Sequence, residues 1–163
     1  LIEEGYHTRI LLSAAKLYDV EITQPFLPTA ALRTLIGALG IMPESVSRPL
    51  SLAGEVLGTL TFLKLLEVAG RVLKHDPELR DQVEERIVEV LVDEIGHISF
   101  NRTCLGAAGL ACASKLLPIV ATMLGDTMPE LRMLGIAPQY DTSPLVKAPG
   151  GIPETVRRAA FIA

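Results

Sequence analysis

The sequence contains no tryptophan, few other aromatic residues and only two cysteines, Cys104 and Cys112. Two cysteines are too few for a disulfide scaffold. Their spacing in an expected helix indicates packed thiols in a reducing compartment, with a redox pair as the alternative. Basic residues are not in excess either, because the net charge is −4, and we therefore expect no binding of nucleic acid.

Signals for export or membrane insertion are also weak. No secretory signal is visible, and the chain begins at Leu1 without methionine, so we expect residues upstream of it. The most apolar run, residues 105–124, is interrupted by Lys115 and Pro118. Since a membrane span needs about 20 predominantly apolar residues, we predict a buried or interface helix instead. A cytoplasmic protein without membrane contact follows from these expectations.

Apolar residues make up 49% of the 163 residues, and leucine, alanine, valine and glycine dominate. This length is typical of one domain that can bury a core. No stretch has the alternating pattern of a strand, whereas helical periodicity recurs along the chain. We therefore predict an all-α fold in one domain, residues 1–163, with bundle helices in residues 1–101 and further helices and an irregular tail in residues 102–163.

Periodicity and boundary residues also predict where the helices lie. The expected helices span residues 1–20, 29–39, 50–74 and 77–101, with a helical continuation to about residue 124 and short helices at 126–134 and 154–162. The proline-containing segments 20–28 and 43–49 are expected to be loops. Asp76 followed by Pro77 is a strong start signal, and the short connection before it makes the two long helices an antiparallel hairpin.

The most informative stretch is Val83 to Asn101, where Glu94 and His97 lie three residues apart on one helical face. That face is otherwise apolar and carries Val83, Ile87, Val90, Leu91 and Ile98. A carboxylate and an imidazole on a buried face need partners, because an unpaired buried charge is costly. For Glu-x-x-His on a bundle helix, a metal ion is the simplest partner.

The same spacing occurs in the first expected helix, at Glu4 and His7. With thirteen glutamates among 163 residues, two of the three histidines would follow a glutamate at this helical spacing by chance only about 2% of the time. An acidic residue, Glu3 or Asp93, also precedes each motif glutamate. The repeat therefore indicates a functional pair of motifs.

The hairpin geometry selects a further acidic residue from the helix at residues 50–74. Glu94 lies about 18 residues after the turn, so its partner should lie about 18 residues before it, near position 58. Glu55 fits this position and shares its face with apolar residues. Glu67 is too close to the turn and points towards Lys64 and Arg71, where a solvated carboxylate with basic neighbours is expected.

Glu4-x-x-His7, Glu55 and Glu94-x-x-His97 together resemble the ligand pattern of the ferritin-like carboxylate-bridged di-iron proteins. That family uses one glutamate from each of two helices and a Glu-x-x-His motif from each of the other two. The resemblance covers roughly residues 1–101, three of four bundle helices and five of six ligands. The glutamate of the family's first helix has no counterpart in this sequence, so we expect a ferritin-like bundle without that helix.

The resemblance implies two iron ions, with manganese as an alternative, and O₂ as a co-substrate. Glu4 and Glu94 would bridge the ions, His7 and His97 would each bind one, and Glu55 would be a terminal ligand; zinc also accepts such ligands. Each ligating imidazole needs its second nitrogen held. By the resemblance, the partners would be Asp93 for His7 and Glu3 for His97, with Asn101 as a further candidate behind the ligands.

The activity implied by the resemblance is that of a non-haem di-iron oxygenase, which hydroxylates or N-oxidises a small organic molecule with electrons from a donor. Aryl-amine N-oxygenases are the first branch to compare, although one such subfamily has histidine where this chain has Val90. A homodimer is one arrangement compatible with the tail. Two alternatives remain open: ferritin-like iron oxidation and storage, and a non-catalytic helical interaction domain with histidines in its core.

Overall fold

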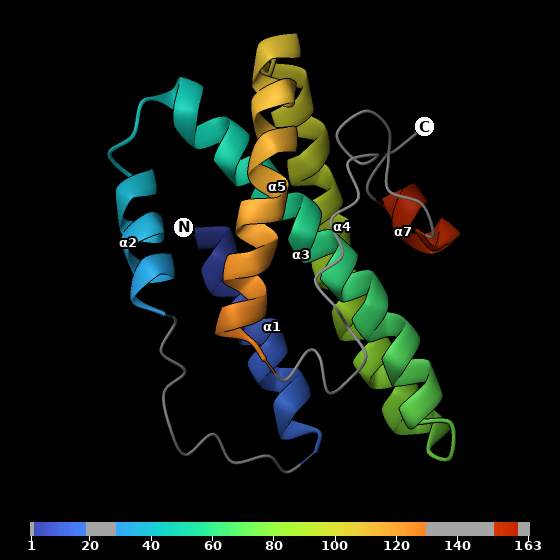
Figure 1. The fold of residues 1–163 in the computed structure, drawn as a ribbon. Coiled ribbons are helices and arrows are strands. Elements are labelled where there is room, and N and C mark those ends of the chain that lie inside the picture. Colours follow the sequence, from blue (N-terminus) through green and yellow to red (C-terminus); the bar gives the residue numbers. More distant parts are fainter. Residues whose placement is uncertain (1, 19–28, 130–151, 160–163) are drawn as a thin grey trace.

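The computed structural model describes residues 2–18, 29–129 and 152–159, and every regular element among these residues is a helix (Figure 1). The elements are α1 (Ile2–Lys16), α2 (Ala30–Leu39), α3 (Glu44–Val72), α4 (Pro77–Cys104), α5 (Ala107–Thr127) and α7 (Glu154–Ala159). The predicted all-α class is confirmed for the described residues, which form a helical bundle.

The centre of the fold is a long antiparallel hairpin formed by α3 and α4 (Figure 1). The side chain of Asp76 accepts a hydrogen bond from the backbone N–H of Leu79 at 3.1 Å and so caps α4. Pro77 follows in the first turn, where a backbone N–H group would have no partner within the helix. These two residues start α4 as predicted, and the short turn places both helices side by side.

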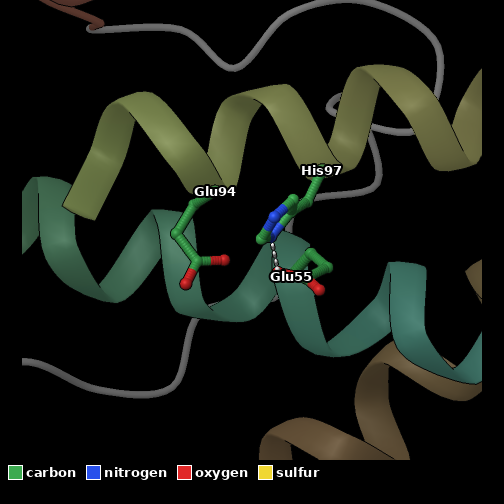
Figure 2. A group of neighbouring side chains, drawn as sticks. All are labelled: Glu55, Glu94 and His97. Carbon is green, nitrogen blue, oxygen red and sulfur yellow. Dashed lines mark ion pairs between the residues drawn. The ribbon is translucent and has the colours of Figure 1, made fainter. Parts of the chain in front are cut away.

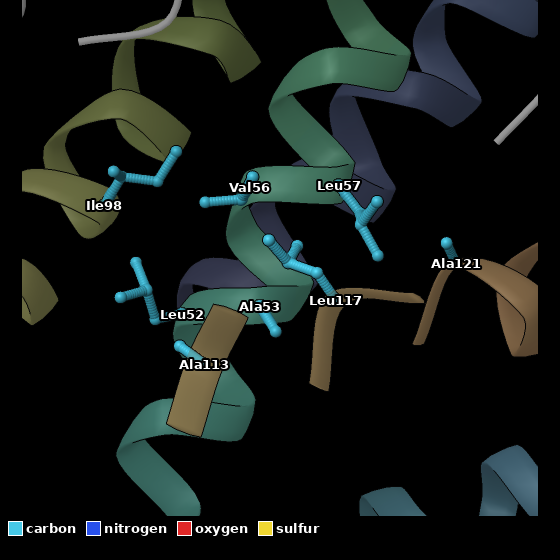
Figure 3. Packing of buried hydrophobic residues seen from close by; sticks show 8 residues of the cluster. All are labelled: Leu52, Ala53, Val56, Leu57, Ile98, Ala113, Leu117 and Ala121. Atoms are coloured by element: carbon cyan, nitrogen blue, oxygen red, sulfur yellow. The ribbon is translucent and has the colours of Figure 1, made fainter. Parts of the chain in front are cut away.

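Packing of α5 against α3 produces an apolar core that lies beside the upper half of the hairpin (Figures 1 and 3). Small residues on α5 allow the helices to approach closely, since interhelical distance depends on the side chains at the contact. The buried members of this core are Leu52, Ala53, Val56 and Leu57 of α3, Ile98 of α4, and Ala113, Leu117 and Ala121 of α5.

Much of α5 outside this core is exposed or only half-buried. Only 17% of its most apolar 18-residue window is buried, and by length and composition α5 could cross a membrane. Its contact with α3 agrees with a helix that packs along one face, as the sequence predicts. The apolar sequence of α5 also allowed a completely buried helix, which the structure does not show.

α4 has a neighbour on three sides, because it contacts α3, α1 and α7. Val156 of α7 is fully buried against Leu91 and Ile95 of α4, within a second core that also contains Ala69, Val83 and Ile87. α1 also packs against α4. The helix that carries Glu94 and His97 therefore packs against three other described helices.

One predicted loop is helical. Residues 43–49 were expected to form a loop because they contain two prolines, but α3 begins at Glu44 and includes Pro49. Proline removes one hydrogen bond inside a helix, and the burial of Pro49 in the protein interior offsets this loss. A salt bridge between Glu44 and Arg48, four residues apart, also supports the first turns.

The predicted continuation of α4 into α5 is wrong, because the helix breaks after Cys104. Leu105 has extended backbone angles, and Gly106 is the N-cap of α5. The side chain of Leu105 folds over Gly109, where a Cβ atom would lie 2.6 Å from Leu105 Cδ2. Gly109 thus provides the space in which the chain reverses.

Other helix boundaries differ modestly from the prediction. α1 ends at Lys16 and continues as a turn through Tyr18, earlier than the expected end near residue 20. Asp126 and Thr127, expected to start a short helix, are the last residues of α5. Most of that predicted helix, residues 130–134, lies outside the described residues, as does the loop predicted at residues 20–28. The helix predicted at 154–162 is present as α7 to its last described residue, Ala159.

Candidate metal centre

Glu94 and His97 project from α4 towards α3, as their spacing predicts (Figure 2). Glu94 is only 6% exposed, and the neighbouring Val90 and Ile98 on α4 are buried. A carboxylate at this depth is stable only with polar or charged partners, because desolvation of an isolated charge is costly. Two other helices supply those partners.

Glu55 of α3 lies opposite this pair (Figure 2). Its Oε2 atom is 3.5 Å from Nδ1 of His97, and one ligand atom from each of Glu55, Glu94 and His97 lies within 4.8 Å of the other two. The Glu94 carboxylate faces Gly58 of α3, where a Cβ atom would be at ordinary contact distance, 3.7 Å from Glu94 Oε2. The Glu94 carboxylate can therefore lie close to the backbone of α3.

His7 of α1 reaches the same carboxylate from a third helix. Its Nδ1 atom lies 3.2 Å from Glu94 Oε1, and its Nε2 atom lies 3.3 Å from Asp93 Oδ2. The His7 side chain is buried, and the centroid of its ring is 6.1 Å from that of His97. Both imidazoles therefore gather around Glu94, and each nitrogen of His7 faces a carboxylate.

The charge state of Glu55 follows from these contacts. Burial acts to raise the pKa of the Glu55 carboxyl group, because its charged form loses water. The close contacts with His97 and Glu94 and the nearby charges of His97 and His7 outweigh this effect, and the pKa of Glu55 is lowered. Glu55 is thus held in the ionised form that binds a cation.

Some of the residues predicted to orient the ligands are among the described residues. Asp93 contacts His7, which is the pairing that the family resemblance implies for this acid. Asn101 is buried further along α4. Glu3 and Glu4 belong to α1, but their side chains lie outside the described part of the structure. Their predicted roles towards His97 and the metal ions remain predictions.

The two acids of α3 differ as expected. Glu67 is solvent-exposed and forms an ion pair with Lys64, whose Nζ atom lies 2.6 Å from Glu67 Oε2. Glu55 instead points into the bundle beside His97. The register of the α3–α4 hairpin therefore brings Glu55, and not Glu67, to Glu94.

One polar contact near the site was not predicted from the sequence. The hydroxyl group of Tyr6, the residue before His7, donates a hydrogen bond to Oε1 of Glu89 on α4. Glu89 lies four residues before Asp93, hence one turn away on the same side of the helix. The sequence does contain a signal for this contact: acidic residues repeat at this spacing on α4, and Tyr6 lies within the Glu-x-x-His motif of α1.

The donor set fits a transition metal. Bonds from imidazole nitrogen or carboxylate oxygen to such an ion are about 2.0–2.2 Å long, so two ligands of one ion lie about 3–4 Å apart. The ligand atoms of Glu55, Glu94 and His97 lie within 4.8 Å of one another. Side-chain rotations that move these atoms by about an ångström would bring them to the spacing of ligands on one ion. Oxygen and imidazole ligands of this kind suit iron or manganese.

Comparison of the sequence with protein-family models, with curated proteins and with solved structures found no match in any of the three. The assignment of a function therefore depends on the residues of this chain and on the geometry that they adopt.

Proposed function

We propose that this chain is a non-haem di-iron oxidoreductase with a ferritin-like helix arrangement, which uses O₂ to oxidise a small organic substrate. The observation that carries the proposal is the position of Glu94. Its buried carboxylate is shared by His97 and Glu55 in one direction and by His7 in another. A carboxylate between two imidazoles is the arrangement expected of a residue that bridges two cations.

The proposal assigns ligands to two ions. Glu55, Glu94 and His97 would hold the first, and Glu94 and His7 would hold the second together with Glu4, which the resemblance adds. The lowered pKa of Glu55 supports this assignment, because metal binding requires deprotonated carboxylates. When bound, iron would supply the electrons for the reduction of O₂, and an external donor would restore them.

The chain's own residues would position the ligands and keep water out. Asp93 holds Nε2 of His7 and leaves Nδ1 directed at Glu94. Such contacts fix the orientation of a ligating imidazole and raise its basicity. Val56, Val90 and Ile98 are buried on the facing helices, and such apolar side chains limit the access of water to the buried Glu94 carboxylate.

The proposed substrate class comes from the family resemblance. A small organic molecule would be oxidised at carbon or nitrogen, as in the oxygenase branch that the motifs resemble. Val90 is fully buried where one N-oxygenase subfamily has a histidine. We therefore propose a centre with one imidazole from each motif and no third histidine from α4.

Reconstitution under anaerobic conditions tests the proposal. The purified protein is loaded with Fe(II), freed of unbound metal, analysed for iron and then exposed to O₂ while its optical spectrum is recorded. We expect about two equivalents of iron per chain, as for a site of the di-iron pattern, and a new near-ultraviolet or visible absorption after oxygen is added. The Glu67→Ala variant, altered at an exposed acid, is the matched control and should behave like the unmodified protein.

Two outcomes contradict the proposal. Less than one equivalent of bound transition metal would favour a non-catalytic helical interaction domain. A large hollow assembly that accumulates many iron ions per chain, measured by light scattering and metal analysis, would favour iron storage.

A further inference from the structure

Few of the described apolar side chains of α1, at residues 6–16, are buried in the bundle. Among its described residues, His7 and Ile10 are buried, whereas Tyr6, Leu11 and Leu12 are 38–42% exposed. Burial of apolar area stabilises a helix roughly in proportion to that area, so one isoleucine provides little to set the rotation of α1. Its contact with α4 must be defined largely by polar groups.

Two polar contacts meet this need. His7 pairs with Asp93 and Glu94, and the hydroxyl group of Tyr6 donates a hydrogen bond to Glu89. Glu89 and Asp93 are four residues apart and therefore lie about 6 Å apart along the α4 axis, at 1.5 Å per residue. Two consecutive residues of α1 are thus fastened at two levels of α4, which fixes both the rotation and the height of α1.

The Tyr6 contact is itself supported on both sides. Arg86 Nη1 lies 3.4 Å from Glu89 Oε2, and the guanidinium carbon of Arg9 lies 5.3 Å from the centre of the Tyr6 ring. A cation over an aromatic face is attracted by the ring quadrupole.

We infer that Tyr6 is a positioning residue for His7: its hydrogen bond with Glu89 holds α1 at the rotation and height that direct Nδ1 of His7 to Glu94. Tyr6 itself would touch neither metal nor substrate. The consequence for metal binding rests on the proposed function, whereas the anchoring of α1 is a property of the metal-free chain and can be measured separately.

Hydrogen–deuterium exchange of the metal-free protein tests the anchoring. Tyr6→Phe removes only the hydroxyl group, and Tyr18→Phe makes the same change at an exposed tyrosine just after α1. We expect amides of α1 around His7 to exchange about fivefold faster in Tyr6→Phe, the effect of losing one hydrogen bond, and to be unchanged in Tyr18→Phe. Equal exchange in the two variants would overturn the inference.

Titration with Co(II), followed by visible spectroscopy, tests the consequence for His7. We expect Tyr6→Phe to lower the affinity for the ion bound by His7 about tenfold, as for other groups that orient a ligand. The affinity for the ion at Glu55 and His97 should be unchanged. Glu89→Gln retains an oxygen that accepts the hydrogen bond and should preserve binding, whereas Glu89→Ala should reproduce Tyr6→Phe.

The outcomes separate the two ideas. If the unmodified protein binds two Co(II) ions and Tyr6→Phe binds both equally well, the inference is overturned while the proposed function stands. If the unmodified protein binds no Co(II), the proposed function fails, and the exchange experiment alone decides whether Tyr6 anchors α1.

Discussion

Nδ1 of His97 lies 3.5 Å from Oε2 of Glu55, and this contact joins the two long helices at the candidate metal centre. It exists because the turn at Asp76 sets the register of the hairpin, so that residues at similar distances from the turn face each other. Glu94 and His97 are accordingly placed beside Glu55 on a largely apolar interface. The hairpin register therefore brings three candidate ligands from two neighbouring helices to one place.

Replacement of Glu94 or His97 by alanine is predicted to abolish loading of the first ion. Each residue would supply one of the three ligand atoms of the proposed site, and Glu94 also contacts His7. Loss of one ligand should lower metal affinity by more than about 10–100-fold, which is typical for a group behind a ligand. Metal analysis and circular dichroism check this; retained metal, or loss of helicity instead of metal, would contradict it.

A comparison of the two acids of α3 tests the hairpin register. Glu55→Ala should remove metal, whereas Glu67→Ala should retain it, because Glu67 is solvent-exposed and pairs with Lys64. Exposed ion pairs contribute little to stability, so Glu67→Ala should also unfold like the unmodified protein. Metal loss in Glu67→Ala would show that the wrong acid has been assigned.

Asp93→Asn is predicted to lower the affinity for the ion bound by His7 selectively. The Asp93 carboxylate lies 3.3 Å from Nε2 of His7, and asparagine keeps its shape but removes its charge. A reduction of about 10–100-fold in affinity is expected for such a partner, with the ion at Glu55 and His97 retained. Stepwise titration with Co(II) would reveal the difference, and equal weakening of both ions would argue against this role.

The stability of the metal-free protein should depend on pH through Glu55. Its pKa in the folded protein is lowered from the ordinary value of 4.5, so the unfolded chain binds the proton more tightly. The stabilisation is therefore present above about pH 4.5 and is lost as the pH falls through the folded-state pKa. Urea unfolding at pH 7 and below 4.5 measures this. Glu55→Gln should lose less stability on acidification, and an identical loss would contradict the prediction.

Leu117→Ala is predicted to reduce stability without changing the metal centre. Leu117 is fully buried between α5 and α3, and truncation of such a leucine costs about 2–5 kcal/mol. Ile119→Ala, on the same helix at a position that is 56% exposed, should have little effect. Denaturant unfolding and the metal content of the folded protein provide the measurements; loss of metal from folded Leu117→Ala would link α5 to the site.

Much of the helical framework could be predicted from local features. Asp76 and Pro77 mark a helix start whatever surrounds them, because capping satisfies donors of the same turn. The inward positions of Glu55 and Glu94 follow from helical periodicity and a short turn. By contrast, Pro49 was expected in a loop but lies in a helix, because burial offsets its missing hydrogen bond.

The sequence by itself determined that the chain is helical, that each Glu-x-x-His motif shares one helical face, and that Glu55 rather than Glu67 faces Glu94. Helical hydrogen bonding and side-chain spacing within a few residues suffice for the first two conclusions, and the equal distances of Glu55 and Glu94 from the short turn give the third. Only the tertiary structure decided that α1 meets α4 with Tyr6 at Glu89 and His7 at Asp93 and Glu94. Contacts between helices far apart in the chain depend on how whole surfaces pack, and no local pattern specifies that packing.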